Sequence, residues 1–210
     1  MNRKIGMYSS AVNIAAVVGF AACMPFSFDL GSYLFSMFIA LSFVPMVCAY
    51  ACFSDKSRRA AGYTAIGFAA MYAAIILIVY FTQLTAVRSG GLSEQASLIL
   101  DYKRFGLFFS FDMLGYALMS LSTFFAGLAV NVKSKADKWL KALLMIHGVF
   151  FFSCLIMPML GLFNESAGGS NSSELVGIAV LEFWCAYFIS VGILSLRHFV
   201  KSDDEKDYKK

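Results

Sequence analysis

Charged residues are scarce in this chain. Only 14% of its 210 residues are Asp, Glu, Lys or Arg, against roughly 25% in an ordinary soluble domain. Sixty per cent are hydrophobic, and they fall in long unbroken runs. The basic residues lie between these runs rather than in one patch, so the net charge of +4 does not indicate a nucleic-acid partner. The composition predicts a polytopic membrane protein whose first partner is the lipid bilayer.

Motifs for nucleotide, metal or hydrolase chemistry are missing as well. The chain has no P-loop, no H-E-x-x-H and no G-x-S-x-G. All five cysteines fall within or at the edge of apolar segments, so we do not expect a disulfide framework. We predict no cofactor and no metal site. Any energy input must then come from an ion gradient or from a separate partner.

Six apolar runs are each long enough to cross a bilayer as a helix of about 20 residues. They cover residues 7–25, 30–53, 60–83, 105–131, 140–162 and 175–196. All but three of the 17 Lys and Arg residues lie at the termini or in the second-to-third and fourth-to-fifth connections. Because positive residues accumulate on the cytoplasmic side, we expect both termini to be cytoplasmic.

The predicted fold is therefore an all-α, polytopic integral membrane protein. A bundle of six transmembrane helices covers residues 1–198, and a charged cytoplasmic tail covers 199–210. We expect the cell (plasma) membrane as its location. The long third-to-fourth connection has a helical signal of its own, because Ser93 is a suitable N-cap and apolar residues follow at helical spacing. It predicts an outer interfacial helix over residues 93–104, with an extension of the fourth span as the alternative.

Small residues are dense in the first and third spans. Ala11, Ala15 and Gly19 are spaced four apart in the first, and nine Ala and Gly residues lie between positions 60 and 74 of the third. Such stripes let helix backbones approach closely in lipid. We expect both spans to be tightly packed, either within the chain or against a membrane protein partner or a second copy in a homo-oligomer.

Five residues recur at the same relative positions in two segments 83 residues apart. The segments are FSFDLGSY at 26–33 and FSFDMLGY at 109–116, and each leads into a span predicted to run inward. A duplicated hairpin with parallel repeats, as in some transporters, would explain the match. Chance matching in a membrane sequence rich in Phe and Ser is the alternative.

Two acids lie inside predicted spans, where ionised groups are costly. At a rise of 1.5 Å per residue, Asp112 lies roughly 28 Å above the inner end of the fourth span, and Glu182 roughly 21 Å above that of the sixth. Asp112 is therefore predicted to be shallow and Glu182 to be the costlier acid. An acid at such a depth protonates, pairs with a cation or faces a hydrated cavity.

We interpret this region as an outward-facing acidic pocket for a cation, a proton or an amine-bearing molecule. The candidate ligand- or proton-binding residues are Glu182, Asp112, Tyr116 and Tyr187, with Asp29 as a secondary candidate. The structural alternative for Asp112 is a bond to Tyr102, Lys103 or Arg104 near the start of its own helix. The alternative for Glu182 is a protonated acid bonded within the bundle.

His147 in the fifth span is a further secondary candidate. Cys154 follows seven residues later on nearly the same face, and this pairing resembles the small membrane peptidases that process quorum-sensing peptides. Two helical turns separate the two by about 10 Å, too far for a thiol–imidazole hydrogen bond. His198 lies at the inner end of the sixth span, and two histidines are a weak ligand set for a metal or haem. We assign no catalytic residue.

Three functions remain open. The first is a transporter, or a substrate-binding membrane subunit, for an unknown small molecule or cation. In size and span number the outline resembles the substrate-binding subunits of energy-coupling-factor importers, whose docking faces Ala11 and Ala15 would suit. The second is a non-catalytic membrane partner, such as an immunity, sensor or assembly protein. The third is an intramembrane enzyme using His147, Cys154 and the acids.

Overall fold

The structure, a computed structural model, describes residues 1–161 and 171–202, with side chains of the last helix from residue 177 onward. These residues form helices and short connections, with no strand among them. Six helical segments are long and apolar enough to cross a membrane: Asn2–Phe26, Asp29–Cys52, Lys56–Val87, Leu107–Ala129, Lys135–Met159 and Gly177–Lys201. The prediction of an all-α chain with six candidate spans is confirmed. The predicted tail beyond residue 202 lies outside the described residues.

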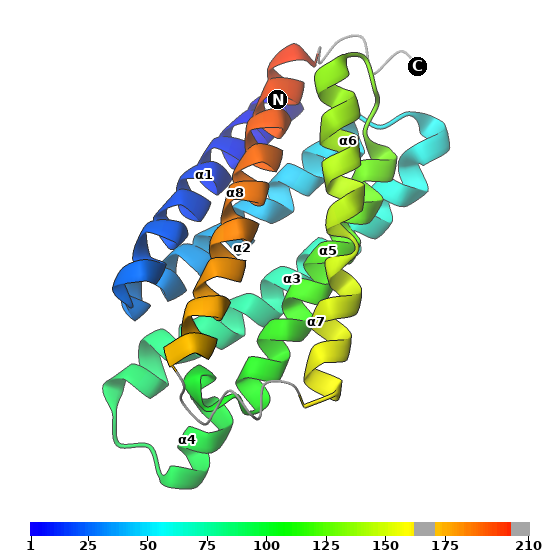
Figure 1. The fold of residues 1–210 in the computed structure, drawn as a ribbon. Coiled ribbons are helices and arrows are strands. Elements are labelled where there is room, and N and C mark those ends of the chain that lie inside the picture. Colours follow the sequence, from blue (N-terminus) through cyan, green and yellow to red (C-terminus); the bar gives the residue numbers. More distant parts are fainter. Residues whose placement is uncertain (162–170, 203–210) are drawn as a thin grey trace.

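The spans pack in a closed order around the bundle (Figure 1). The helix α1 (Asn2–Cys23) lies between α2 (Asp29–Cys52) and α8 (Asn171–Lys201), and α3 (Arg59–Thr82) lies between α2 and α5 (Leu107–Ala129). The fifth span consists of α6 (Lys135–His147) and α7 (Phe150–Met159), which both pack on α5. Contacts between α6 and α8 join the fifth span to the sixth and complete the ring of spans. Figure 1 shows that α1 begins and α8 ends at the same end of the bundle.

Small residues set how closely these helices approach. A Cβ atom on Gly19 of α1 would lie 2.5 Å from the Phe35 ring of α2. On α3, Ala65 is fully buried, and its carbonyl accepts a 2.8 Å hydrogen bond from the Ser122 hydroxyl of α5. Part of each predicted small-residue stripe is therefore used in packing within the chain.

The connection between α3 and α5 lies at the end of the bundle that is predicted to face outward, which we call the outer end, and it contains the helix α4 (Glu94–Leu100). Ser93 is its N-cap, and the Ser93 hydroxyl accepts a hydrogen bond from the Ala96 amide at 3.2 Å. A 3₁₀ turn, Tyr102–Arg104, follows and ends at Phe105, whose φ of 53° is left-handed. The left-handed residue breaks the path into α5, so the predicted helix forms a separate element and does not extend the fourth span.

Two contacts hold α4 over the ends of the spans. A Cβ on Gly106 would lie 2.2 Å from the Leu98 carbonyl oxygen, so only glycine allows this approach. Gln83, at the start of a π-helical turn (Gln83–Val87) after α3, is 3% exposed. Its side-chain amide donates to the Leu100 carbonyl at 2.8 Å and accepts from the Tyr102 amide at 3.0 Å. This pairing fixes Tyr102 directly beside the outer end of α3.

The fifth span is not the single helix that the sequence predicts over 140–162. It breaks after His147, where the Gly148 amide bonds to the Met145 carbonyl and the Val149 amide to that of Ile146. These bonds reach back three residues instead of four, which tightens the helix locally. A Cβ on Gly148 would also lie 2.9 Å from the Phe124 Cβ of α5. The break arises at this glycine and not at Pro158, which lies inside α7.

Candidate functional site

The outer half of the bundle encloses a carboxylate, that of Asp112, which is only 2% exposed. Five tyrosines from four segments lie close enough to interact with its charge or with one another's hydroxyls. They are Tyr33 of α2, Tyr72 and Tyr80 of α3, Tyr102 of the outer turn and Tyr116 of α5. We call these six residues the Asp112–tyrosine cluster.

Helical spacing brings the cluster together. Asp112 and Tyr116 are one turn apart on α5, and Tyr72 and Tyr80 are about two turns apart on α3, so each pair lies on one helix face. Between these faces, a Cβ on Gly115 would lie only 3.0 Å from the Ile76 Cδ1 atom. The small residue therefore lets α3 and α5 approach closely at the level of the buried acid.

Tyr33 and Tyr102 cover the cluster from the outer end. The Tyr33 ring stacks on Tyr80 with the centroids 5.4 Å apart, and the Tyr102 ring lies 6.1 Å from Tyr80 and 6.3 Å from Tyr33. Toward the middle of the bundle, Tyr116 contacts Trp184 of α8 edge-on at 5.9 Å. The acid thus lies within a continuous set of aromatic rings.

Hydrogen bonds within the cluster converge on the carboxylate. The hydroxyls of Tyr80 and Tyr102 are its hydrogen-bond partners, and Tyr80 is also bonded to Tyr116. Burial, followed by the nearby charge of Asp112, raises the pKa of Tyr102 well above its usual value. Tyr102 therefore keeps its proton and donates it. Because an ionised carboxylate only accepts, both Tyr80 and Tyr102 donate to it.

Two buried polar atoms of the cluster have no hydrogen-bond partner among the residues that the structure describes. They are Oδ1 of Asp112 and the hydroxyl of Tyr72, whose ring is fully buried. Leaving a buried acceptor unsatisfied costs on the order of 1–3 kcal/mol, and more for a charged group. An acid kept with a free oxygen among hydroxyl groups is suited to binding a proton or a cationic hydrogen-bond donor.

A surface pocket of about 320 Å³ lies on the outer side of the cluster. Tyr33 belongs to both, since it lines the pocket and stacks on Tyr80. The pocket is also lined by Asp29, Leu30, Gln83, Leu84, Val87, Arg88, Asp101 and Lys103. Two acidic and two basic side chains line it, so the pocket is mixed in charge.

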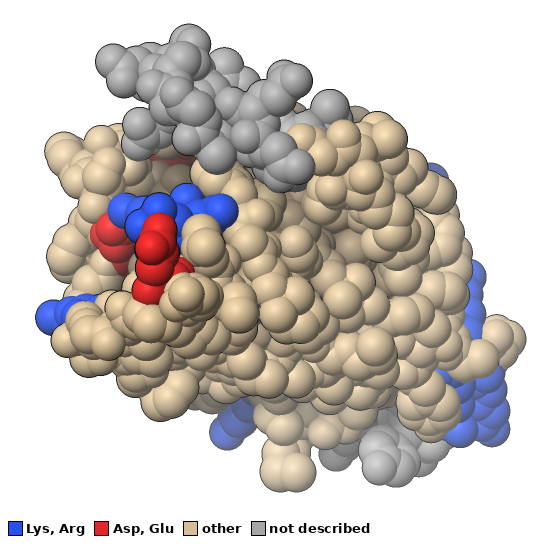
Figure 2. Space-filling view, turned by 90° about the horizontal axis from the view of Figure 1, so that it is seen from below, with Lys and Arg blue, Asp and Glu red and all other residues tan. Residues whose placement is uncertain are grey.

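Figure 2 looks at this end of the bundle and shows acidic and basic side chains gathered in one place, with uncharged surface around them. At the pocket, Lys103 Nζ and Asp29 Oδ2 form an ion pair at 2.5 Å. Asp29 therefore has a cation of its own at the surface. Among the residues predicted as alternative partners of Asp112, Tyr102 is a partner, whereas Lys103 pairs with Asp29.

His147 occupies a separate polar site in the middle of the bundle and is 1% exposed. The Trp184 indole N–H donates to its Nε2 at 3.0 Å, and its Nδ1 lies 2.8 Å from the Thr123 hydroxyl. Because indole is only a donor, Nε2 must be unprotonated, and Nδ1 of the neutral ring carries the proton. Both nitrogens are occupied, and no hydrogen bond joins His147 to Cys154. These hydrogen bonds join His147 to α5 through Thr123 and to α8 through Trp184.

Glu182 and Tyr187 are not brought into the Asp112–tyrosine cluster. Glu182 of α8 is half-buried, with one unpartnered buried oxygen, Oε1. Within the described residues, no hydrogen bond joins it to Asp112. The Tyr187 hydroxyl donates to the Leu143 carbonyl of α6 at 2.5 Å. Inside the protein Asp112 is thus the more buried of the two acids, although the sequence-based depths made Glu182 the costlier one.

Of the six residues of the cluster, the candidates predicted from the sequence include Asp112 and Tyr116 but not Tyr33, Tyr72, Tyr80 or Tyr102. Tyr72 and Tyr80 looked like ordinary residues of an apolar span, because nothing in the sequence indicates which face of α3 meets α5. The eight-residue spacing of these tyrosines was the available signal. Tyr102 was named only as a possible local partner of Asp112.

Comparison with known proteins gives no match: no family model, no curated protein and no solved structure is similar to this chain.

Proposed function

We propose that the chain is a small transporter of the cell membrane, or the substrate-binding membrane subunit of one, for a small molecule that bears an ammonium group. The molecule enters from the outer side and its cation is bound by Asp112. The observation that supports this proposal most directly is the buried carboxylate with a free Oδ1 beneath an open outer pocket. The proposal requires the Tyr33 and Tyr102 rings, which pack on Tyr80 beside the acid, to move aside for the molecule.

The ligand class follows from the groups around the acid. A calcium ion takes six to eight oxygen ligands and usually several carboxylates, whereas the cluster offers one carboxylate. No group of three or more His, Cys, Asp and Glu suited to a metal occurs in the described part of the chain. An ammonium group needs one carboxylate to pair with, and aromatic ring faces add favourable cation–π contacts. The mixed charge of the outer pocket suits an amine that also bears an acidic group.

The test is thermal stability of the purified protein against a panel of amines, each paired with the alcohol of the same carbon skeleton. A ligand at a hundred times its dissociation constant adds about 2.7 kcal/mol, which raises Tm by roughly 5–10 °C in a chain of this size. We expect amines to stabilise the parent and the matched alcohols to have no effect. Equal stabilisation by amine and alcohol, or by neither, would contradict the proposal.

A second candidate is a non-catalytic membrane partner, and the exposed small residues support it. Ala11 and Ala15 of α1 are exposed, as are Gly67, Ala70 and Ala74 of α3. Close helix approach in lipid uses such faces. Replacing Ala11 and Ala15 with leucine should release a co-purifying membrane protein if α1 binds one. An unchanged co-purification profile would remove this face from consideration.

A further inference from the structure

At the opposite end of the bundle, the α2–α3 loop encloses a second pocket, with a volume of about 330 Å³. Its lining residues are Phe53, Ser54, Asp55, Lys56, Ser57, Arg59 and Asn131. By the distribution of basic residues, this end is the one predicted to be cytoplasmic. The pocket is therefore independent of the Asp112–tyrosine cluster.

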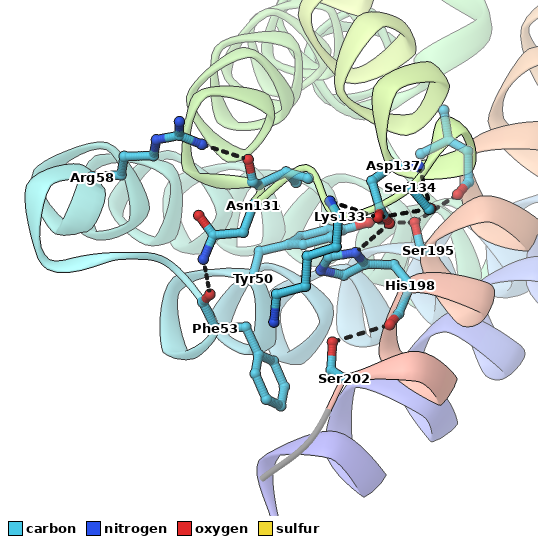
Figure 3. A network of polar contacts seen from close by, with 12 residues as sticks. Tyr50, Phe53, Arg58, Asn131, Lys133, Ser134, Asp137, Ser195, His198 and Ser202 are labelled. Carbon is cyan, nitrogen blue, oxygen red and sulfur yellow. Dashed lines mark hydrogen bonds and ion pairs between the residues drawn. The ribbon is translucent and has the colours of Figure 1, made fainter. Parts of the chain in front are cut away.

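Hydrogen bonds from the α5–α6 connection hold the floor of this pocket (Figure 3). The Asn131 side-chain amide donates to the Phe53 carbonyl at 2.8 Å, as Figure 3 shows. It also donates to Asp55 Oδ1 at 3.0 Å. Both acceptors are oxygens, which fixes the orientation of the amide. Arg58, next to the pocket, donates to the Val130 carbonyl at 2.9 Å. The loop is thus anchored, and its one carboxylate already has a partner.

The two remaining cations of the pocket have no such role. Lys56 and Arg59 are exposed, and within the described residues the side chain of neither forms a hydrogen bond or an ion pair. Ser54 and Ser57 line the same pocket. The Ser54 hydroxyl already donates to the Ala51 carbonyl at 2.8 Å, so the Ser57 hydroxyl is the one left to donate. The pocket also lies at the N-terminal end of α3, where the helix dipole favours a negative charge. Two cations, a hydroxyl and a helix N-terminus are the groups that bind phosphate in proteins.

The surface below the pocket indicates where the phosphate comes from. Tyr63, one turn along α3 from Arg59, is 65% exposed, and tyrosine is enriched at the level of lipid headgroups. Further along the same helix, Gly67 has open space around it, and Met71 and Ile78 are 53% and 60% exposed. An apolar face therefore runs from the pocket along α3, as the acyl chains of a lipid would require.

We infer that this pocket binds the phosphate group of an anionic phospholipid, with Lys56 and Arg59 as its counter-charges and the acyl chains lying along α3. Basic residues near an anionic headgroup add favourable electrostatic energy, and an ordered pocket concentrates it at one position. Such a lipid would fix the α2–α3 loop relative to the α5–α6 connection.

The experiment is native mass spectrometry of the full chain in detergent, titrated with phosphatidylglycerol and, separately, with zwitterionic phosphatidylcholine. The test variant is the double substitution Lys56→Gln/Arg59→Gln. The matched control is Lys135→Gln/Lys138→Gln, which removes the same charge from exposed residues at the start of α6. We expect phosphatidylglycerol to bind more tightly than phosphatidylcholine, with a loss of about tenfold to thirtyfold in the test variant and less than about threefold in the control.

Equal losses of phosphatidylglycerol affinity in the two double variants, or no loss in either, would overturn the inference. The lipid would then be attracted by the basic surface as a whole, or not at all. A charge-preserving variant, Lys56→Arg/Arg59→Lys, must retain binding, which separates lost contacts from a misfolded loop. Glycerol 3-phosphate and inorganic phosphate form the third arm. If these two phosphates lose affinity in the test variant but not in the control, and phosphatidylglycerol does not, then the phosphate bound in this pocket does not belong to a lipid.

Discussion

The two FSFD segments share five residues, yet the acid of one lies at the surface and the acid of the other is buried. In FSFDLGSY, Asp29 is the first residue of α2 and pairs with Lys103 at the surface. In FSFDMLGY, the helix α5 starts at Leu107, so Asp112 lies five residues into it and is buried. Five residues correspond to roughly 7.5 Å of helix. The position at which the helix starts, and not the local motif, decides whether the acid meets solvent or the bundle interior.

The tyrosines of the two segments behave alike. Tyr33 and Tyr116 both belong to the Asp112–tyrosine cluster, one above the acid and one a turn beyond it. One acid is thus surrounded by both tyrosines, while the other acid stays at the edge of the outer pocket. The shared motif therefore gives one buried acid, Asp112, and one surface acid, Asp29, and not two equivalent sites.

The largest expected effect separates the two acids. Asp112→Asn keeps the shape and removes the charge, so we expect the affinity for a stabilising amine to fall at least about a hundredfold, as is usual when one partner of a desolvated charge pair is removed. Asp29→Asn acts at an exposed position and should change affinity by no more than a few fold. Titration of both variants with the same amine checks the difference. Comparable losses would remove the distinction between the two segments.

The hydroxyls around the acid give the next largest effect. Tyr80→Phe or Tyr102→Phe removes a hydrogen bond to a buried carboxylate, so the free energy of unfolding should fall by about 1–3 kcal/mol. Tyr33→Phe keeps the ring that stacks on Tyr80, so the free energy of unfolding should change by less than about 0.5 kcal/mol. Thermal unfolding in one detergent compares the three. A Tyr33 variant as unstable as the other two would show that its hydroxyl matters more than its ring.

The glycines of the two segments sharpen the comparison through packing. A Cβ on Gly31 would lie 2.5 Å from the Cys23 sulfur and from the Phe28 ring, so Gly31→Ala should destabilise by about 1–2 kcal/mol. At Gly115 the nearest atom is the end of a flexible side chain, Ile76 Cδ1, at 3.0 Å. The better helix propensity of alanine, about 1 kcal/mol, offsets that strain, so Gly115→Ala should stay close to the parent in Tm. The reverse order would contradict this assignment of the tighter contact.

The smallest effect concerns the surface ion pair. Lys103 and Asp29 side chains are 59% and 47% exposed, and exposed pairs contribute at most about 1 kcal/mol. Lys103→Gln should lower Tm only slightly, and the difference should vanish in high salt because mobile ions screen the pair. A large and salt-independent loss would mean that Lys103 supports the fold in another way.

Much of the fold follows from residue patterns, because long apolar runs and an N-cap such as Ser93 act locally. The break in the fifth span was not predictable in this way. It depends on Gly148 lying against Phe124, a residue 24 positions away along the chain. The site was predictable only in part for the same reason. Asp112 is conspicuous in an apolar run, but Tyr72 and Tyr80 are recognisable only when α3 is packed on α5.

The measurement that tests the central claim most directly is the affinity of one stabilising amine for the Asp112→Asn and Glu182→Gln variants, by isothermal titration calorimetry at a single pH. Both substitutions remove one carboxylate charge from the outer half of the bundle. Binding that is lost in Asp112→Asn and kept within about threefold in Glu182→Gln is the result that the Asp112–tyrosine cluster predicts. Binding that survives in Asp112→Asn and disappears in Glu182→Gln would contradict the account and move the site to α8.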